Sequence, residues 1–262
     1  MTLPLLASVD GAIGPSAEAT IPATDEGLLR GDGAFEVVRL YGGMPFAMDE
    51  HLARIAHTAE GLRLPYDAAA LGTEVDALLQ RAAGEDGLLR VVLTRGGRRL
   101  LLLEALPKRP ASQTVRTVTY SPTRVLTGLK TLSYGANMLA GRLAREQGAD
   151  EGLFVTPHGR VLEGPTWTLF WVAGGRLLTP PLSDHILRSI TRDHVLACCD
   201  VEERVTTLDD LLAADEAFIA SSVREVMPIA AIDDRRFDGV PGPVTAAAAD
   251  ALRAHVRGLL AA

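Results

Sequence analysis

Lys130 lies in a run of small and apolar residues, TGLKTLSYG, where an amine could react rather than only carry charge. The chain has 26 Lys and Arg residues in total, but only two of them are lysines. The other, Lys108, belongs to the Pro-rich polar stretch LPKRPAS and is typical of a solvated residue. An amine can form a Schiff base or transfer a proton near neutral pH, whereas a guanidinium stays protonated. Lys130 is therefore a candidate nucleophile; the alternative is a lysine whose stem packs while its head reaches water.

Three features of the second half of the chain could act together with this amine. Glu163 stands just before the Gly-Pro turn of VLEGPTWTLF, where an acid is also commonly solvated. The segment LRSITRDH predicts a helix that begins near Thr191, and its free N–H groups and positive dipole end suit a phosphate. Ser221 and Ser222 in ASSVRE add two hydroxyls, which ordinary turn chemistry would also explain.

An amine, an acid and an anion cradle together match the needs of pyridoxal 5'-phosphate. The amine would hold the aldehyde of this cofactor, and the cradle would bind its phosphate. The acid would stand opposite the ring nitrogen and keep it protonated, so that the ring can accept electrons from the Cα of a substrate. The sequence therefore predicts a pyridoxal-phosphate site that involves Lys130, Glu163 and the start of the helix near Thr191.

Strand and helix patterns alternate along the first half of the chain. A hairpin is expected over 5–13 with its turn at Asp10-Gly11, and two β runs over 33–48 join at Gly42-Gly43. A helix is predicted over 49–64 with Asp49 as its N-cap, because Leu52, Ile55, Ala59 and Leu62 recur at helical spacing. The remaining elements are a helix over 67–83 and strands over 88–96 and 98–107.

The second half repeats this style after a polar, Pro-rich stretch. A strand is predicted over 114–122, hairpins over 151–164 and 168–180, and a strand, loop and strand over 216–229. Helices are predicted over 134–148, from 190 to 200, and from about Pro243. We therefore expect a mixed α/β (α+β) protein of two domains, 1–107 and 122–262, joined by a linker over 108–121.

Composition and charge argue against several classes of protein. The 262 residues carry a net charge of −7, which disfavours a nucleic-acid partner. No apolar stretch approaches the length of a membrane helix, and the start of the chain has no cationic region of a signal peptide. The two cysteines, Cys198 and Cys199, are adjacent and lack the spacing of a zinc site. We expect a cytoplasmic protein with no membrane, nucleic-acid or metal partner.

Five segments, in order, resemble the class IV (fold type IV) pyridoxal-phosphate enzymes. They are RGDGAFEVVRLYGGMPFAMDEHLARI, LKTLSYGANMLA, DEGLFVTPHGRVLEGPTWTLF, ILRSITRD and ADEAFIASSVREVMPI. The family includes branched-chain aminotransferases, D-amino-acid aminotransferases and 4-amino-4-deoxychorismate lyases. The resemblance extends from about Asp25 to Val244. It implies the two-domain fold of this family, an active site at the domain interface, and a homodimer.

The resemblance assigns a role to each matching residue. Lys130 would form the aldimine with the cofactor and later carry the proton between Cα and C4′, and Glu163 would hold the pyridine nitrogen. Arg54 would reach the phosphate, although it lies off the apolar stripe of its helix and would otherwise be assigned to a solvated face. The other cofactor neighbours would be the backbone amides of Ile190 and Thr191, the hydroxyls of Ser222 and, more weakly, Ser221, and the side chain of Tyr134.

Several residues depart from the family pattern near the expected substrate pocket. Phe35 stands where the D-amino-acid enzymes tend to carry Tyr, and Trp167 and Thr168 stand where small or polar residues and Asn are common. Trp167 could narrow the pocket or only fill a gap. Arg98 or Arg99 could bind a substrate carboxylate, or both could be solvated turn residues.

The resemblance favours a pyridoxal-phosphate-dependent aminotransferase that moves an amino group between an amino acid and a 2-oxo acid through Lys130. Two alternatives remain open. The first is a 4-amino-4-deoxychorismate lyase, which would release pyruvate and 4-aminobenzoate with the same cofactor residues. The second is a cofactor-binding or structural α/β protein without turnover.

Overall fold

The computed structural model describes residues 5–82 and 84–261, which form two compact units. The first unit contains the residues up to Lys108 together with Leu129–Tyr134, and the second contains Arg109–Gly128 and the residues from Gly135 onward. Residues 1–4 of the expected first domain and residue 83, the last of the predicted helix 67–83, lie outside the described residues.

The division differs from the expected domains at Lys130. The lysine was expected in the domain 122–262, but its segment clusters with the first unit. The reason is a short antiparallel pairing with the start of a strand of that unit: the Leu132 N–H donates to the Gly33 carbonyl at 2.8 Å. Thr131 also forms an isolated β-bridge with Ala34.

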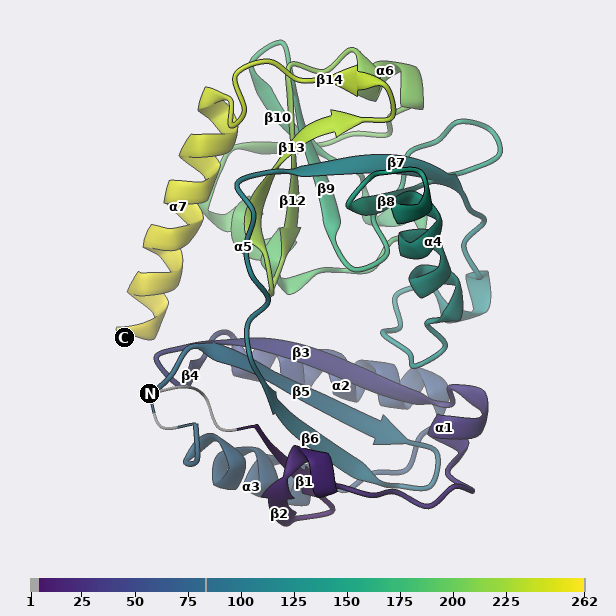
Figure 1. Cartoon of the computed structure of the whole chain (residues 1–262), viewed down its shortest axis with the longest axis vertical. Helices are drawn as coiled ribbons and strands as arrows, with labels where there is room; N and C mark the ends of the chain where they lie inside the picture. The colour runs from purple at the N-terminus through teal and green to yellow at the C-terminus, as the bar shows by residue number, and fades with distance from the viewer. Residues whose placement is uncertain (1–4, 83, 262) are drawn as a thin grey trace. The chain divides into compact units, whose positions relative to one another are not determined.

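A six-stranded sheet forms the body of the first unit, in the order β2-β1-β6-β5-β3-β4 (Figure 1). All of its pairs are antiparallel, as the predicted hairpins require. The strands are β1 (Leu6–Val9), β2 (Ala12–Pro15), β3 (Gly33–Tyr41), β4 (Met44–Pro45), β5 (Gly87–Thr94) and β6 (Arg99–Glu104).

Two helices cover this sheet and share one apolar core with it. They are α2 (Met48–Leu62) and α3 (Ala68–Leu79), while α1 (Glu26–Arg30) and the 3-10 turn η1 (Ser16–Glu18) are short. Ile55 and Ala59 of α2 and Val75 of α3 pack with the buried residues of β3, β5 and β6. The predicted N-cap of α2 is wrong, because the capping position is Ala47. Asp49 lies instead in the first turn, where its charge complements the helix dipole.

The expected linker over 108–121 contains a strand, as the prediction of a strand over 114–122 requires. Residues Gln113–Thr119 form β7, an internal strand of the second sheet that pairs in parallel with β8 (Glu151–Val155) and β13 (Glu225–Ile232). Parallel partners lie far away along the chain, so a polar run such as QTVRTVT gives no local sign of them.

The second unit is built on this eight-stranded sheet, in the order β11-β10-β9-β12-β13-β7-β8, with β14 paired to β13. Its other strands are β9 (Thr168–Ala173), β10 (Arg176–Thr179), β11 (Val201–Glu203), β12 (Glu216–Ser221) and β14 (Arg235–Arg236). The predicted hairpin through Gly174-Gly175 is present as β9 and β10. In the hairpin predicted over 151–164, only β8 is a regular strand, and its partner segment pairs irregularly.

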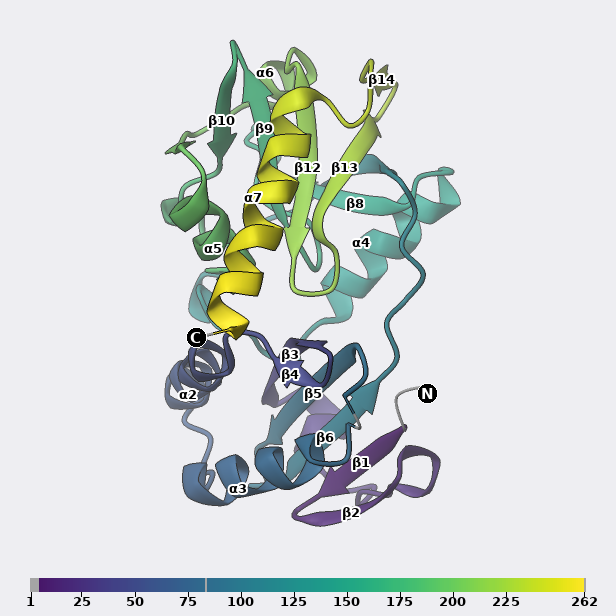
Figure 2. The ribbon, with the colours of Figure 1, turned by 90° about the vertical axis from the view of Figure 1, so that its left-hand side faces the viewer.

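Helices α5 (Ile190–Cys198) and α7 (Pro243–Leu260) belong to this unit, and Figure 2 shows α7 running beside β12 and β13. The remaining elements are α4 (Gly135–Glu146), α6 (Leu208–Leu212), η2 (Arg124–Leu126) and η3 (Leu182–Asp184). The main core gathers Leu153, Leu169, Trp171 and Ile219 from the sheet. Among residues 5–82 and 84–261, no helix is both long enough and apolar enough to cross a membrane.

Candidate active site

Both backbone groups of Lys130 are fixed within the first unit. The Lys130 N–H donates to the hydroxyl of Thr58, a buried residue of α2, at 3.2 Å. The Lys130 carbonyl accepts from the Phe35 N–H of β3 at 3.1 Å. The half-buried lysine is therefore held between a helix and a strand rather than on a freely moving loop.

The amine of Lys130 lies beside two aromatic rings. Its Nζ atom is 4.4 Å from the centroid of the Phe35 ring and 5.8 Å from that of Tyr134. The two rings meet edge to face, with centroids 5.0 Å apart and an interplanar angle of 86°. A cation within about 6 Å of an aromatic face is attracted by the ring quadrupole. Phe35 and Tyr134, both expected near the site, thus form one cluster with Lys130.

Arg54 forms a bidentate ion pair with Glu36, which the sequence reasoning missed. The Nε and Nη2 atoms of Arg54 each lie 2.6 Å from a carboxylate oxygen of Glu36. The Nδ1 atom of His51 lies 2.7 Å from the same carboxylate, and the side chains of Glu36 and His51 are 1% and 2% exposed. The planar guanidinium is therefore oriented by a buried acid.

The electrostatics of this triad assign its protonation states. Burial alone would raise the pKa of Glu36, but the hydrogen bonds from Arg54 and His51 lower that pKa to about 2. Burial lowers the pKa of His51, with Arg54 and Lys130 contributing in the same direction against the effect of Glu36. An ionised Glu36 can only accept, so a neutral His51 must carry its proton on Nδ1.

A signal for Glu36 was present in the sequence. Residues two apart on a strand share a face, so Glu36 of β3 lies on the same face as Ala34, Val38 and Leu40, which are fully buried. A carboxylate on the core face of a strand requires a charged partner. That requirement, together with an arginine off the apolar stripe of the next helix, would have indicated the Glu36–Arg54 pair.

Glu163 of the second unit lies in a β-bulge. The Phe154 N–H donates to the Glu163 carbonyl and the Leu162 N–H donates to the Phe154 carbonyl, both at 2.9 Å, so two residues stand opposite one. Bulges often re-aim a side chain beside an active site. The half-buried carboxylate of Glu163 accepts from the Leu187 N–H at 3.0 Å. Burial and the charge of Glu163 raise the pKa of Tyr120, so this tyrosine stays neutral.

The N-terminus of α5 has the geometry expected for anion binding. Ser189 is its N-cap, and the Ser189 side chain accepts from the Arg192 N–H at 3.3 Å. The amides of Ile190 and Thr191 belong to the first turn, whose N–H groups have no carbonyl one turn earlier in the helix. Both residues are buried, so the positive end of the helix dipole is only weakly screened at this point.

The two serines differ in environment. Ser221, buried at the end of β12, accepts from the Arg224 N–H at 3.1 Å through its hydroxyl, which is ordinary turn chemistry. Ser222 is half-buried in the same loop. Arg224 ties this loop to Thr166 at 3.3 Å and forms an ion pair with Glu151.

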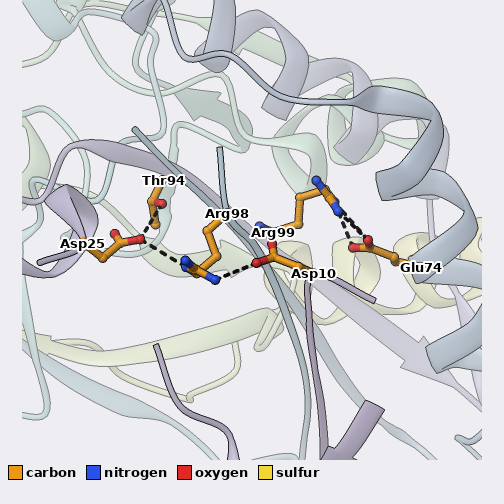
Figure 3. Close-up of polar contacts among 6 residues, drawn as sticks. All are labelled: Asp10, Asp25, Glu74, Thr94, Arg98 and Arg99. Carbon is orange, nitrogen blue, oxygen red and sulfur yellow. Dashed lines mark hydrogen bonds and ion pairs between the residues drawn. The ribbon is translucent and has the colours of Figure 1, made fainter. Parts of the chain in front are cut away.

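Arg98 and Arg99 are each paired with carboxylates of their own unit (Figure 3). Arg98 contacts Asp10 at 2.6 Å and Asp25 at 3.3 Å. The Nη2 and Nε atoms of Arg99 donate to Oε1 of Glu74 at 2.8 and 3.0 Å. These hydrogen bonds raise the pKa of Arg99. The geometry gives no support to either arginine as a substrate-carboxylate binder, nor to the alternative of two solvated turn residues.

The expected site residues divide between the units. The first unit brings together Phe35, Lys130 and Tyr134, and it holds Arg54 in the Glu36 pair. Arg98 and Arg99 also lie in the first unit, and the candidates of the second unit are Glu163, Ile190, Thr191, Ser221 and Ser222. A family model described as amino-transferase class IV matches residues 33–232, a span that contains every one of these residues.

The chain belongs to the class IV aminotransferase family. A putative branched-chain-amino-acid aminotransferase of Methanocaldococcus jannaschii is 32% identical over 252 residues, covering 87% of this chain and 88% of that protein. A D-alanine aminotransferase of Bacillus licheniformis is 31% identical, with 90% and 92% covered. An aminodeoxychorismate lyase of Bacillus subtilis is 29% identical, with 91% and 90% covered. The enzyme family expected from the five segments is thus confirmed.

Solved structures of class IV family members share the fold. A hypothetical aminotransferase of Mycobacterium tuberculosis, in a form with bound pyridoxal phosphate, superposes with a TM-score of 0.89 at 25% identity and covers 97% of this chain and 99% of that one. A branched-chain aminotransferase of Thermoproteus uzoniensis, solved with norvaline, also gives a TM-score of 0.89, at 27% identity, covering 97% and 95%. The mixed α/β architecture expected for this family is therefore confirmed.

Proposed function

We propose that this protein is a pyridoxal-phosphate-dependent aminotransferase that moves an amino group between an amino acid and a 2-oxo acid. The observation that carries the proposal is the amine of Lys130 beside Phe35 and Tyr134, within the span that matches the family model. The pyridoxal phosphate bound to a structural neighbour supports the choice of cofactor.

The residues present fit the chemical groups of the cofactor one by one. Lys130 offers an amine for the aldehyde, and Glu163 offers a carboxylate held by the Leu187 N–H for the ring nitrogen. The phosphate needs cations and N–H donors, which Arg54 and the first turn of α5 provide. The hydroxyl of Ser222 is a further donor for this phosphate. When bound, the cofactor supplies an electron-accepting ring.

Each residue has a defined task in this proposal. Lys130 would hold the cofactor through its amine and, once released, would move the proton of the substrate Cα. The buried Glu36 orients the guanidinium of Arg54, which would bind the phosphate. Glu163 would keep the ring nitrogen protonated, since a nearby carboxylate favours the charged form of a pyridine.

A lyase acting on 4-amino-4-deoxychorismate is the second candidate. It is supported by the 29% identity to the aminodeoxychorismate lyase of Bacillus subtilis, which differs little from the identities to the aminotransferases. Both reactions would use the residues above. They differ in their products: an amino acid and a 2-oxo acid in the first reaction, and pyruvate and 4-aminobenzoate in the second.

The products distinguish the two candidates. The purified protein, reconstituted with pyridoxal phosphate, would be given amino acids of both hands with a 2-oxo acid acceptor, and separately aminodeoxychorismate. An aminotransferase yields a new amino acid and a new 2-oxo acid in equal amounts. Release of pyruvate from aminodeoxychorismate, with no amino transfer to any acceptor, would refute the first choice in favour of the second. A protein that holds the cofactor through Lys130 but turns over neither substrate would be a binding protein.

We further propose a homodimer, as the family resemblance implies. Leu28 and Leu29 on α1 are 61% and 59% exposed and offer apolar surface for a second copy. Light scattering should give a mass near twice the 27.8 kDa of one chain, and a mass of one chain at micromolar concentration would contradict the dimer.

A further inference from the structure

The turn that follows Glu163 folds back onto Trp167. The Gly164 N–H donates to the Trp167 carbonyl at 2.9 Å, and the two residues form an isolated antiparallel bridge. The Trp167 side chain is only 4% exposed and packs in the main core of the second unit. Trp167 thus connects the core to the turn that follows Glu163, the residue proposed to hold the ring nitrogen.

The indole of Trp167 occupies the space that a side chain at position 164 would need. A Cβ atom built on Gly164 would lie 1.9 Å from Cε2 of Trp167 and 2.2 Å from its Cδ2. Gly164 does not have a positive φ, so its backbone conformation would accept alanine. The ring of Trp167 therefore excludes a Cβ at position 164, because it packs closely against Gly164, the residue that follows Glu163.

The Nε1 atom of Trp167 is buried and has no hydrogen-bond partner among the described residues. A buried indole N–H usually finds an acceptor. Among the described residues, the ring therefore contributes volume to the core and no hydrogen bond. Other contacts hold the turn from outside the core: the Asn137 side chain donates to the Pro165 carbonyl at 2.8 Å.

We propose that Trp167 is a positioning residue that fixes the direction of the Glu163 carboxylate through Gly164. This inference rests on the proposed function, because it assumes that Glu163 faces the ring nitrogen of the cofactor. It explains why a large ring stands where the resemblance led us to expect a small or polar residue. Trp167 fills a gap under the turn, which is one of the two roles left open by the sequence.

The first test separates positioning from mere packing. The affinity of the apoprotein is measured for pyridoxal phosphate and for its 1-deaza analogue, in which carbon replaces the ring nitrogen. Trp167→Ala and Trp167→Phe should weaken binding of the natural cofactor, by about tenfold for alanine and less for phenylalanine, as expected for loss of a charge-assisted hydrogen bond. Binding of the analogue, which offers Glu163 no nitrogen, should change by less than about twofold. Trp171→Phe, in the same core, is the control and should leave the affinity ratio unchanged.

The second test is a double-mutant cycle read from thermal unfolding of the apoprotein. Gly164→Ala should lower the unfolding midpoint, and adding Trp167→Ala should raise it again, because the larger ring no longer meets the new Cβ. Additive losses in this cycle, or equal weakening of both cofactors by Trp167→Ala, would overturn the inference alone. A wild-type protein that bound neither cofactor would refute the proposed function and the positioning role with it.

Discussion

The guanidinium of Arg54 and the carboxylate of Glu36 meet in a bidentate ion pair with both N···O distances at 2.6 Å. Glu36 is 1% exposed and Arg54 is 13% exposed, so water screens this pair poorly. The Nδ1 atom of His51 lies 2.7 Å from Oε2 of the same carboxylate. The residue proposed to hold the phosphate is thus fixed by an acid that does not itself reach the solvent.

Replacing Glu36 by Gln should be strongly destabilising. The variant leaves the charge of Arg54 without its buried partner, and removal of one member of a buried ion pair costs about 3 kcal/mol or more. Urea unfolding measures this loss directly. Glu104→Gln is the matched control, because the Arg90–Glu104 pair is about one-third exposed on each side and is expected to contribute at most about 1 kcal/mol. Equal losses of unfolding free energy for the two variants would contradict the special contribution of the buried Glu36–Arg54 pair.

The same pair predicts how stability depends on acid. The pKa of Glu36 is lowered in the folded chain from 4.5 to about 2, so the unfolded chain binds the proton more readily. The contribution of Glu36 is therefore fully present above about pH 4.5 and is lost as the pH falls towards 2. The lowered pKa of His51 acts in the same direction, with loss beginning as the pH falls below its ordinary value of 6.5. Unfolding free energies measured at a series of pH values should fall less steeply for Glu36→Gln than for the wild type.

Removing the Phe35 ring from the aromatic cluster around Lys130 should slow the reaction. Phe35→Leu keeps an apolar side chain but removes the ring 4.4 Å from the Lys130 amine. A cation–π contact contributes about 0.5 to 2 kcal/mol, so we expect the rate constant to fall about threefold to thirtyfold. Tyr134→Phe keeps the second ring and should change the rate by less than about twofold. A larger effect of Tyr134→Phe than of Phe35→Leu would show that the hydroxyl matters and the cluster of rings does not.

Arg99 should contribute to the stability of the folded protein and not to substrate binding. Arg99→Met leaves Glu74 without its guanidinium, and an unpaired, mostly buried acid costs about 1 to 3 kcal/mol of stability. The KM for the amino acid should stay within about twofold of the wild-type value, because no substrate contact is removed. A tenfold rise in KM with unchanged stability would restore Arg99 to the substrate site.

Local patterns in the sequence predicted much of the fold. Pairs of glycines at 42–43 and 174–175 mark two hairpins that the structure contains, because both residues of each pair have positive φ. The rarity of lysine singled out Lys130, and the five segments gave the family. These signals are local in the chain, or belong to one residue type.

The features that the sequence did not reveal depend on distant pairings. A strand was predicted over 114–122, but the linker was expected to extend to residue 121, because the partners of β7, the strands β8 and β13, are parallel and reached only through crossovers. The pairing of Thr131 with Ala34 moved Lys130 into the first unit. Glu36 had a signal in its place on the buried face of a strand, but the contact of His51 with it arises only when the strand and the helix that carry them pack together. Trp167 was noted as a departure, but its contact with Gly164 is visible only in three dimensions.

The attachment of the cofactor to Lys130 tests the central claim most directly. The protein with bound pyridoxal phosphate would be reduced with borohydride, digested, and mapped by mass spectrometry; only Lys108 and Lys130 offer side-chain amines. We predict that the added mass lies on the peptide with Lys130, that Lys108→Arg leaves it there, and that Lys130→Arg abolishes it. A label on Lys108, or a wild-type protein that stays colourless and unlabelled, would contradict the account.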